Sequence, residues 1–103
     1  MSRRTEIQEA GKYVGLSAAH WVCYGEGWRE VGDYRGRVEE ILGDITLNED
    51  EFTECCAAAV KRAAAYIARA YATPGKTLIP EDEKTALMLA GQDIQAILAP
   101  YHP

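Results

Sequence analysis

The sequence predicts an all-α domain: a compact bundle of about four helices formed by residues 1–103 as a single domain. Three observations carry this prediction. Large apolar residues recur at intervals of three and four, which is the period of a helix that faces a core. Glycine and proline signals at 25–27, 43 and 73–75 divide that pattern into four segments. No alternating run is long enough to compete as a strand.

The first two predicted helices cover residues 5–24 and 28–42. Thr5 is the candidate N-cap of the first helix, and the glycines at 25 and 27 end it. One face of this helix carries Ile7, Val14, Ala18, Trp21 and Val22. Gly43 is placed to end the second helix in a left-handed cap. The three-four spacing in the second helix is kept by Trp28, Val31, Arg35, Val38, Ile41 and Leu42.

The third predicted helix starts after Asn48 and runs to residue 72, and the fourth covers 81–99. Asn48 and Glu51 have the spacing of a capping box. The apolar stripe of the third helix consists of Phe52, Cys56, Ala59, Val60, Ala63, Ile67 and Ala70. Pro80 and Pro100 are expected to start and stop the fourth helix, whose inward residues are Leu87, Ala90, Ile94, Ile97 and Leu98. Acidic residues at 49–51 and 81–83 favour the positive ends of these helix dipoles.

The glycines predict unusually close helix packing. Gly11 and Gly15 share one face of the first helix, and Gly32 and Gly36 repeat the spacing in the second. A glycine inside a helix costs about 1 kcal/mol relative to alanine, so each pair suggests a close backbone contact as compensation. The alanine-rich third helix offers a matching surface, in the same chain or in a second copy. Because Leu, Ile, Val and Phe number only twenty, we also expect a homodimer to bury further surface.

The charge and the cysteines limit the function classes. The net charge of -5, with Arg3-Arg4 and Lys61-Arg62 as the only basic pairs outside mixed-charge stretches, argues against direct binding of nucleic acid, which normally needs a basic face. The longest uncharged run, 13–25, is too short to span a bilayer, and no secretory signal is evident. Three cysteines do not form an even disulfide framework, so we expect free thiols in a reducing cytoplasm.

The stretch His-Trp-Val-Cys-Tyr-Gly-Glu-Gly-Trp at 20–28 combines an imidazole, a thiol, a carboxylate and three aromatic rings, yet it predicts no catalytic or metal chemistry. His20 and Cys23 lack the paired spacings of a zinc site, and no Glu-x-x-His motif indicates a di-iron bundle. No residue is identifiable that would orient a Cys–His nucleophile, and the phosphate-binding glycine loop is incomplete. We therefore predict no metal, no cofactor and no enzymatic activity.

The aromatic residues of this stretch leave three interpretations open: core, interface or pocket. Trp21, Tyr24 and Trp28 follow at helical spacing, and Trp and Tyr concentrate binding energy in protein contacts. The predicted interface consists of Trp21, Tyr24, Trp28, Gly32 and Gly36. The alternative is a small-molecule-binding bundle with an aromatic pocket around Trp21, Tyr24 and Trp28. The candidate pocket residues are His20, Cys23 and Tyr66.

From these patterns the leading functional hypothesis is a small regulator or inhibitor that acts stoichiometrically. It would occupy a surface of a larger protein partner, as an antiactivator or a phage-type anti-defence protein does. Such a protein needs a complementary face and no chemistry of its own. The sequence names no partner.

Overall fold

The computed structural model describes residues 2–103 and is all-helical over that range, so the predicted fold class is confirmed. The elements are α1 (Arg3–Tyr24), α2 (Arg29–Leu42), α3 (Glu49–Ala72), α4 (Glu83–Leu98) and a closing 3-10 turn (Ala99–Tyr101). None of the helices in this part of the chain has the length and apolar character needed to cross a membrane.

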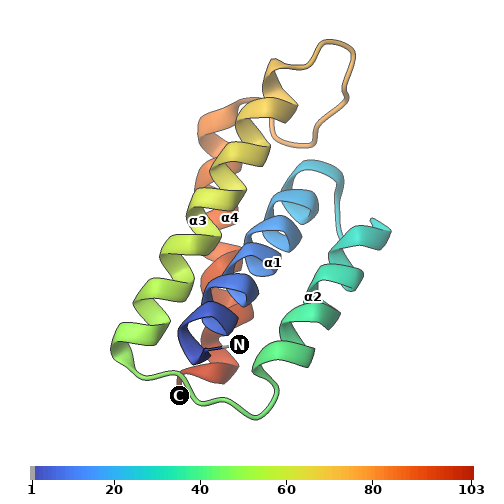
Figure 1. The fold of residues 1–103 in the computed structure, drawn as a ribbon. Helices are drawn as coiled ribbons and strands as arrows, with labels where there is room; N and C mark the ends of the chain where they lie inside the picture. Colours follow the sequence, from blue (N-terminus) through green and yellow to red (C-terminus); the bar gives the residue numbers. More distant parts are fainter. Residues whose placement is uncertain (1) are drawn as a thin grey trace.

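Helix α1 is the centre of the fold. It packs against all three other helices, and α3 and α4 also pack against each other. Figure 1 shows α1 between α3 and α2, with α4 behind, and the four helices run alternately up and down. Helices α1 and α3 therefore lie side by side in the same direction, while α2 is held mainly by α1.

Two of the predicted helix starts are wrong, in both cases because a neighbouring polar residue caps the helix. The amide of Thr5 donates a hydrogen bond to Ser2 Oγ at 3.2 Å, so Ser2 is the N-cap and α1 begins earlier than predicted. At α4 the amide of Thr85 donates to Asp82 Oδ1 at 2.7 Å, and Pro80 lies before the helix. The predicted capping box of Asn48 and Glu51 is confirmed.

The predicted helix ends are partly right. Gly25, with φ +100°, ends α1 as expected. Gly43 is not a left-handed cap: its φ is -45°, and its amide donates to the Glu39 carbonyl at 2.8 Å, so it continues the helical bonding pattern. Pro100 does not end the helical structure, because it lies inside the 3-10 turn that follows α4.

The close packing of glycine and alanine is confirmed for the first pair, within the chain. A Cβ added at Gly11 would stand 2.8 Å from both Ala58 Cβ and the Cys55 carbonyl oxygen. A Cβ added at Gly15 would overlap the backbone carbonyl of Ala59. These two glycines therefore let the backbones of α1 and α3 come into direct contact.

Two residues of the predicted core lie at the surface. Val60 and Leu87 are expected from spacing to face inward, but they are 50% and 37% exposed. Helical spacing identifies a group of neighbouring positions but not the exact rotation of the helix against its neighbours. The buried line of α3 accordingly runs through Cys55, Ala59, Ala63, Ile67 and Ala70, and that of α4 through Ala86, Ala90, Ile94 and Leu98.

Candidate functional site

Six rings form a continuous cluster that joins α1, α2 and α3. His20 is its centre: its ring centroid lies 4.4 Å from that of Tyr66, 5.3 Å from that of Tyr34 and 6.0 Å from that of Tyr24. Tyr34 stacks on Tyr13 at 6.0 Å, and Tyr24 stacks on Trp28 at 4.8 Å. We call Tyr13, His20, Tyr24, Trp28, Tyr34 and Tyr66 the aromatic cluster.

The imidazole of His20 is fixed by a backbone contact. The side chain is buried, and its Nδ1 lies 2.7 Å from the carbonyl oxygen of Leu16, one turn earlier in α1. A carbonyl oxygen only accepts, so Nδ1 carries the proton of this hydrogen bond. In the neutral ring, Nε2 is then the nitrogen left to accept from a ligand.

Two phenols and a lysine extend the polar side of the cluster. The Tyr66 hydroxyl donates to Tyr24 Oη at 3.3 Å, and Lys76 Nζ donates to the same oxygen at 3.0 Å. The Lys76 ammonium also stands 5.6 Å from the centroid of the Tyr24 ring, within the range of a cation–π contact. Burial, followed by the contact with Tyr24, raises the pKa of Tyr66, so this phenol stays protonated at neutral pH.

A cavity of about 350 Å³ opens beside these rings. It is lined by His20, Tyr24, Trp28, Glu30, Tyr66, Lys76 and Thr77. This volume is at the lower end for ligand pockets, so it fits one inserted side chain or one small molecule. Glu30 and Lys76 give its rim one charge of each sign.

Trp28 is the outer edge of the cluster. It occupies the N-cap position of α2 yet makes no side-chain capping hydrogen bond, and it is 45% exposed. Serine, threonine, aspartate and asparagine favour this position because their oxygens accept from the first turn, which an indole cannot do. The Trp28 side chain thus does not cap α2, and its ring is held in place by stacking on Tyr24.

The structure brings together some of the predicted site residues and separates others. His20, Tyr24, Trp28 and Tyr66 meet in the cluster. Trp21 is partly buried and packs on the core outside the cluster, and Cys23 is fully buried and does not line the cavity. Gly32 and Gly36 lie exposed on α2, where an added Cβ would meet no atom within 4 Å.

Sequence reasoning missed Tyr13, Tyr34 and Lys76, as well as Glu30 and Thr77 at the cavity. Tyr13 could have been found, because it stands seven residues before His20 and so shares its face of α1. Tyr34 and Lys76 come from α2 and from the loop after α3. No local pattern predicts that a residue of another element will lie against His20.

Two of the three thiols, those of Cys23 and Cys55, are buried in the core. Burial raises the pKa of Cys23, partly opposed by Lys76, and it raises the pKa of Cys55 to about 12. Burial also raises the pKa of Cys56, the one cysteine that is partly exposed. Among residues 2–103 no three His, Cys, Asp or Glu side chains are grouped so that they could hold a metal ion.

These thiols give a direct test of the packing around the cluster. With iodoacetamide at pH 8, we expect Cys56 to be alkylated first, and Cys23 and Cys55 only after unfolding, because a thiol must be accessible and ionised to react. Peptide mass spectrometry over a time course measures the three rates. Rapid alkylation of Cys23 in the folded protein would contradict its burial and revive a nucleophilic role.

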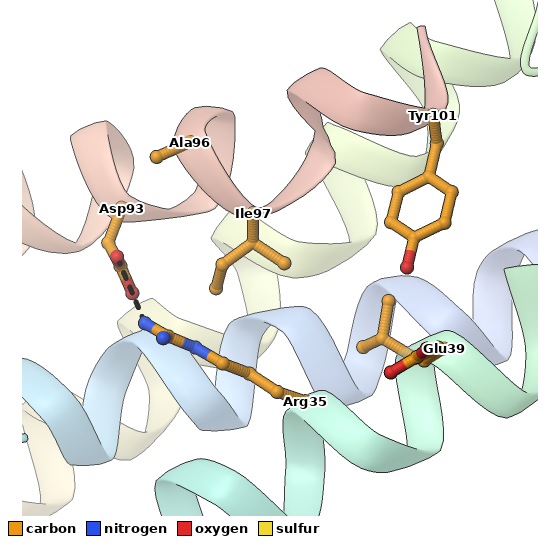
Figure 2. Close-up of a pocket in the computed structure, with 7 residues that line it drawn as sticks. Arg35, Glu39, Asp93, Ala96, Ile97 and Tyr101 are labelled. Atoms are coloured by element: carbon orange, nitrogen blue, oxygen red, sulfur yellow. Dashed lines mark hydrogen bonds and ion pairs between the residues drawn. The ribbon is translucent and has the colours of Figure 1, made fainter. Parts of the chain in front are cut away.

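A second polar contact, outside the aromatic cluster, joins Arg35 of α2 to Asp93 of α4. Figure 2 shows Arg35 extending toward Asp93, with Nη2 3.4 Å from Oδ1. The Asp93 side chain is 9% exposed, and burial raises its pKa against the opposing effect of Arg35. Asp93 Oδ2 and Arg35 Nε have no hydrogen-bond partner among residues 2–103. We interpret the pair as a structural link that gives α2 a polar contact with α4.

Comparison of the chain with protein-family models, with curated proteins and with solved structures found no significant match.

Proposed function

We propose that this protein is a small, non-enzymatic interaction module that regulates or inhibits a larger protein partner by occupying its surface. It acts stoichiometrically, in the manner of an antiactivator or a phage-type anti-defence protein, in the cytoplasm and as a homodimer. The observation that carries the proposal is the exposed ring of Trp28 on the edge of the aromatic cluster.

Trp28 has the properties of an anchor for a protein contact. An exposed tryptophan that neither caps its helix nor completes the core has no structural reason to be at the start of α2. Its stacking on Tyr24 restricts the ring before any partner arrives, so less side-chain entropy is lost on binding. Residues of this type dominate the binding energy of protein interfaces.

The surroundings of Trp28 support binding more than catalysis. The Nδ1 atom of His20 is already engaged by a backbone carbonyl, and the neighbouring phenol of Tyr66 has a raised pKa. The cavity beside Trp28 is instead suited to receive one side chain of the partner, next to the charges of Glu30 and Lys76.

The test is the substitution Trp28→Ser. Serine removes the ring but supplies the N-cap oxygen that α2 lacks, and a good N-cap contributes about 1 kcal/mol, which offsets the lost stacking. We therefore expect unchanged helicity and unfolding temperature. Capture from native cell extract, quantified by mass spectrometry, should show a partner that binds the wild type. Binding of the same partner to the variant should be weaker by about thirtyfold or more.

The matched control is Val60→Ser, which removes an apolar side chain of similar exposure from α3. It should retain the partner. If Trp28→Ser captures the same proteins in the same amounts as the wild type, the aromatic cluster is not the interface.

A small-molecule-binding bundle remains the second candidate, because the cavity is lined by three aromatic residues and His20. In Trp21→Phe, Trp28 is the only tryptophan and reports directly on this cavity. Quenching of its fluorescence by small aromatic compounds, weakened in His20→Ala, would favour a pocket. No change with any compound, together with a partner lost in Trp28→Ser, would favour the interface.

A further inference from the structure

A groove of about 580 Å³ lies between α1 and α3. Its floor contains Ala57, Ala58 and Ala65, and its walls are Arg4, Gln8, Lys12, Glu54, Lys61 and Arg62. The groove follows from the glycine packing: Gly11 lies against Ala58, so α1 and α3 meet at their backbones and leave a smooth, shallow channel between their outer side chains. We call it the basic groove.

The basic groove has a charge opposite to that of the whole chain. Its walls carry four cationic side chains and one carboxylate, although the protein has a net charge of -5. Glu54 is already engaged by Arg4 at 2.9 Å and by Gln8 at 2.8 Å. Lys12, Lys61 and Arg62 form no ion pair with any carboxylate among residues 2–103. Three cations therefore face the groove without an internal counter-charge.

The segment that matches this surface is α2 with its flanks. Residues 26–44 carry six carboxylates against three arginines, and one of those arginines, Arg35, is tied to Asp93. The outer side of α2 shows Asp33 and Glu40 beside the exposed Gly32 and Gly36, and each carboxylate pairs with an exposed arginine of the same helix, Asp33 with Arg29 and Glu40 with Arg37. These glycines pack on nothing within the chain, so α2 has little side-chain bulk at Gly32 and Gly36, and six carboxylates against three arginines leave the segment 26–44 with a net charge of -3.

We propose that the basic groove receives α2 of a second copy of this chain, and that the two copies do so reciprocally. The inference rests on the homodimer of the proposed function and names its interface. Figure 1 shows α3 and α2 on either side of α1, with α4 behind, so the groove between α1 and α3 and the helix α2 lie on neighbouring sides of α1. A single twofold axis roughly parallel to α1 then makes both contacts at once, as a closed dimer requires.

The dimensions agree with this contact. Helix α2 has 14 residues, so it is about 21 Å long at 1.5 Å per residue. The groove extends over about 12 Å on α1, from Arg4 to Lys12, and about 17 Å on α3, from Glu54 to Ala65. A methyl floor facing a glycine face permits the short interaxial distances, near 8 Å, that small residues allow. Each copy contributes one helix and one groove, and the two resulting contacts close the dimer.

A charge swap tests the pairing. The groove variant is Lys61→Glu with Arg62→Glu, and the α2 variant is Asp33→Lys with Glu40→Lys. We expect the wild type to be dimeric at 10 μM in sedimentation velocity, and each variant alone to dissociate with a dissociation constant raised at least tenfold, because like charges face each other. An equimolar mixture should regain the dimer, since both contacts of a mixed pair are again opposite in charge.

The matched control compares two single variants, Lys61→Glu in the groove and Lys84→Glu outside it. Both lysines are exposed, but Lys84 lies on α4 outside the groove. Only the groove substitution should weaken the dimer, while circular dichroism confirms that every variant is folded.

Three outcomes overturn the inference. A dimer unaffected by either variant leaves the homodimer standing but places its interface elsewhere. A wild type that is monomeric at 50 μM removes both the homodimer and this contact. A monomeric wild type that binds an acidic, alanine-rich helical 20-residue peptide, with loss of binding in the groove variant, assigns the groove to a helix of another protein.

Discussion

Gly15→Ala is expected to destabilise the protein by about 3 kcal/mol, although alanine is the better helix former. The added methyl group would overlap the backbone carbonyl of Ala59, which cannot rotate away as a side chain could. Helices α1 and α3 must then separate along their shared length. Urea unfolding followed by circular dichroism at fixed protein concentration measures the effect.

The control for this prediction is Gly91→Ala, in the middle of α4, where an added Cβ meets nothing within 4 Å. It should stabilise the protein by up to about 1 kcal/mol, as expected for glycine replaced in an open helical position. Equal stabilisation by Gly15→Ala would mean that α1 and α3 are further apart than described.

Leu42→Ala is expected to cost about 3 kcal/mol and to act mainly on α2. Helix α2 buries only Val31, Val38 and Leu42, and Leu42 is the largest of them and fully buried. With so few apolar contacts, α2 should open before the rest of the fold. Hydrogen exchange should show its amides losing protection first, while those of α1 and α3 remain protected.

The matched control is Leu87→Ala, the same change at a rim position of α4 that is 37% exposed. It should cost less than 1 kcal/mol, since little burial is lost there. Because Trp28 and Tyr34 stand at or on α2, Leu42→Ala should also weaken the near-ultraviolet circular dichroism of the aromatic cluster. An unchanged signal, with α2 exchanging freely, would mean that the rings hold together without their helix.

The sequence was sufficient for the helices because periodicity and breakers are local signals. Its errors arose where two local candidates competed, as Ser2 and Thr5 did for one N-cap. The two glycine pairs show a deeper limit. Gly11–Gly15 and Gly32–Gly36 have the same spacing, yet the first pair is buried against α3 and the second is open. Spacing predicts that a smooth face exists, but not which surface it will meet.

The candidate site was predictable to the same extent. His20, Tyr24 and Trp28 are near one another in sequence, and Tyr66 was named from its aromatic character alone. Cys23 was placed beside His20 because the two stand three apart, whereas the rotation of α1 against its neighbours turns that thiol into the core. The contact of Tyr34 with His20 could not be predicted, because it depends on how α2 docks on α1, which is set by long-range packing.

The parallel pairing of α1 with α3 also sets the order in which the chain can fold during synthesis. Gly11 and Gly15 contact residues more than forty positions later, so the backbone seam at the centre of the molecule cannot form until α3 has left the ribosome. Only the α1–α2 hairpin is local enough to form earlier, and it leaves the smooth face of α1 without a partner. The nascent protein therefore gains most of its stability late, once α3 and then α4 have followed the hairpin.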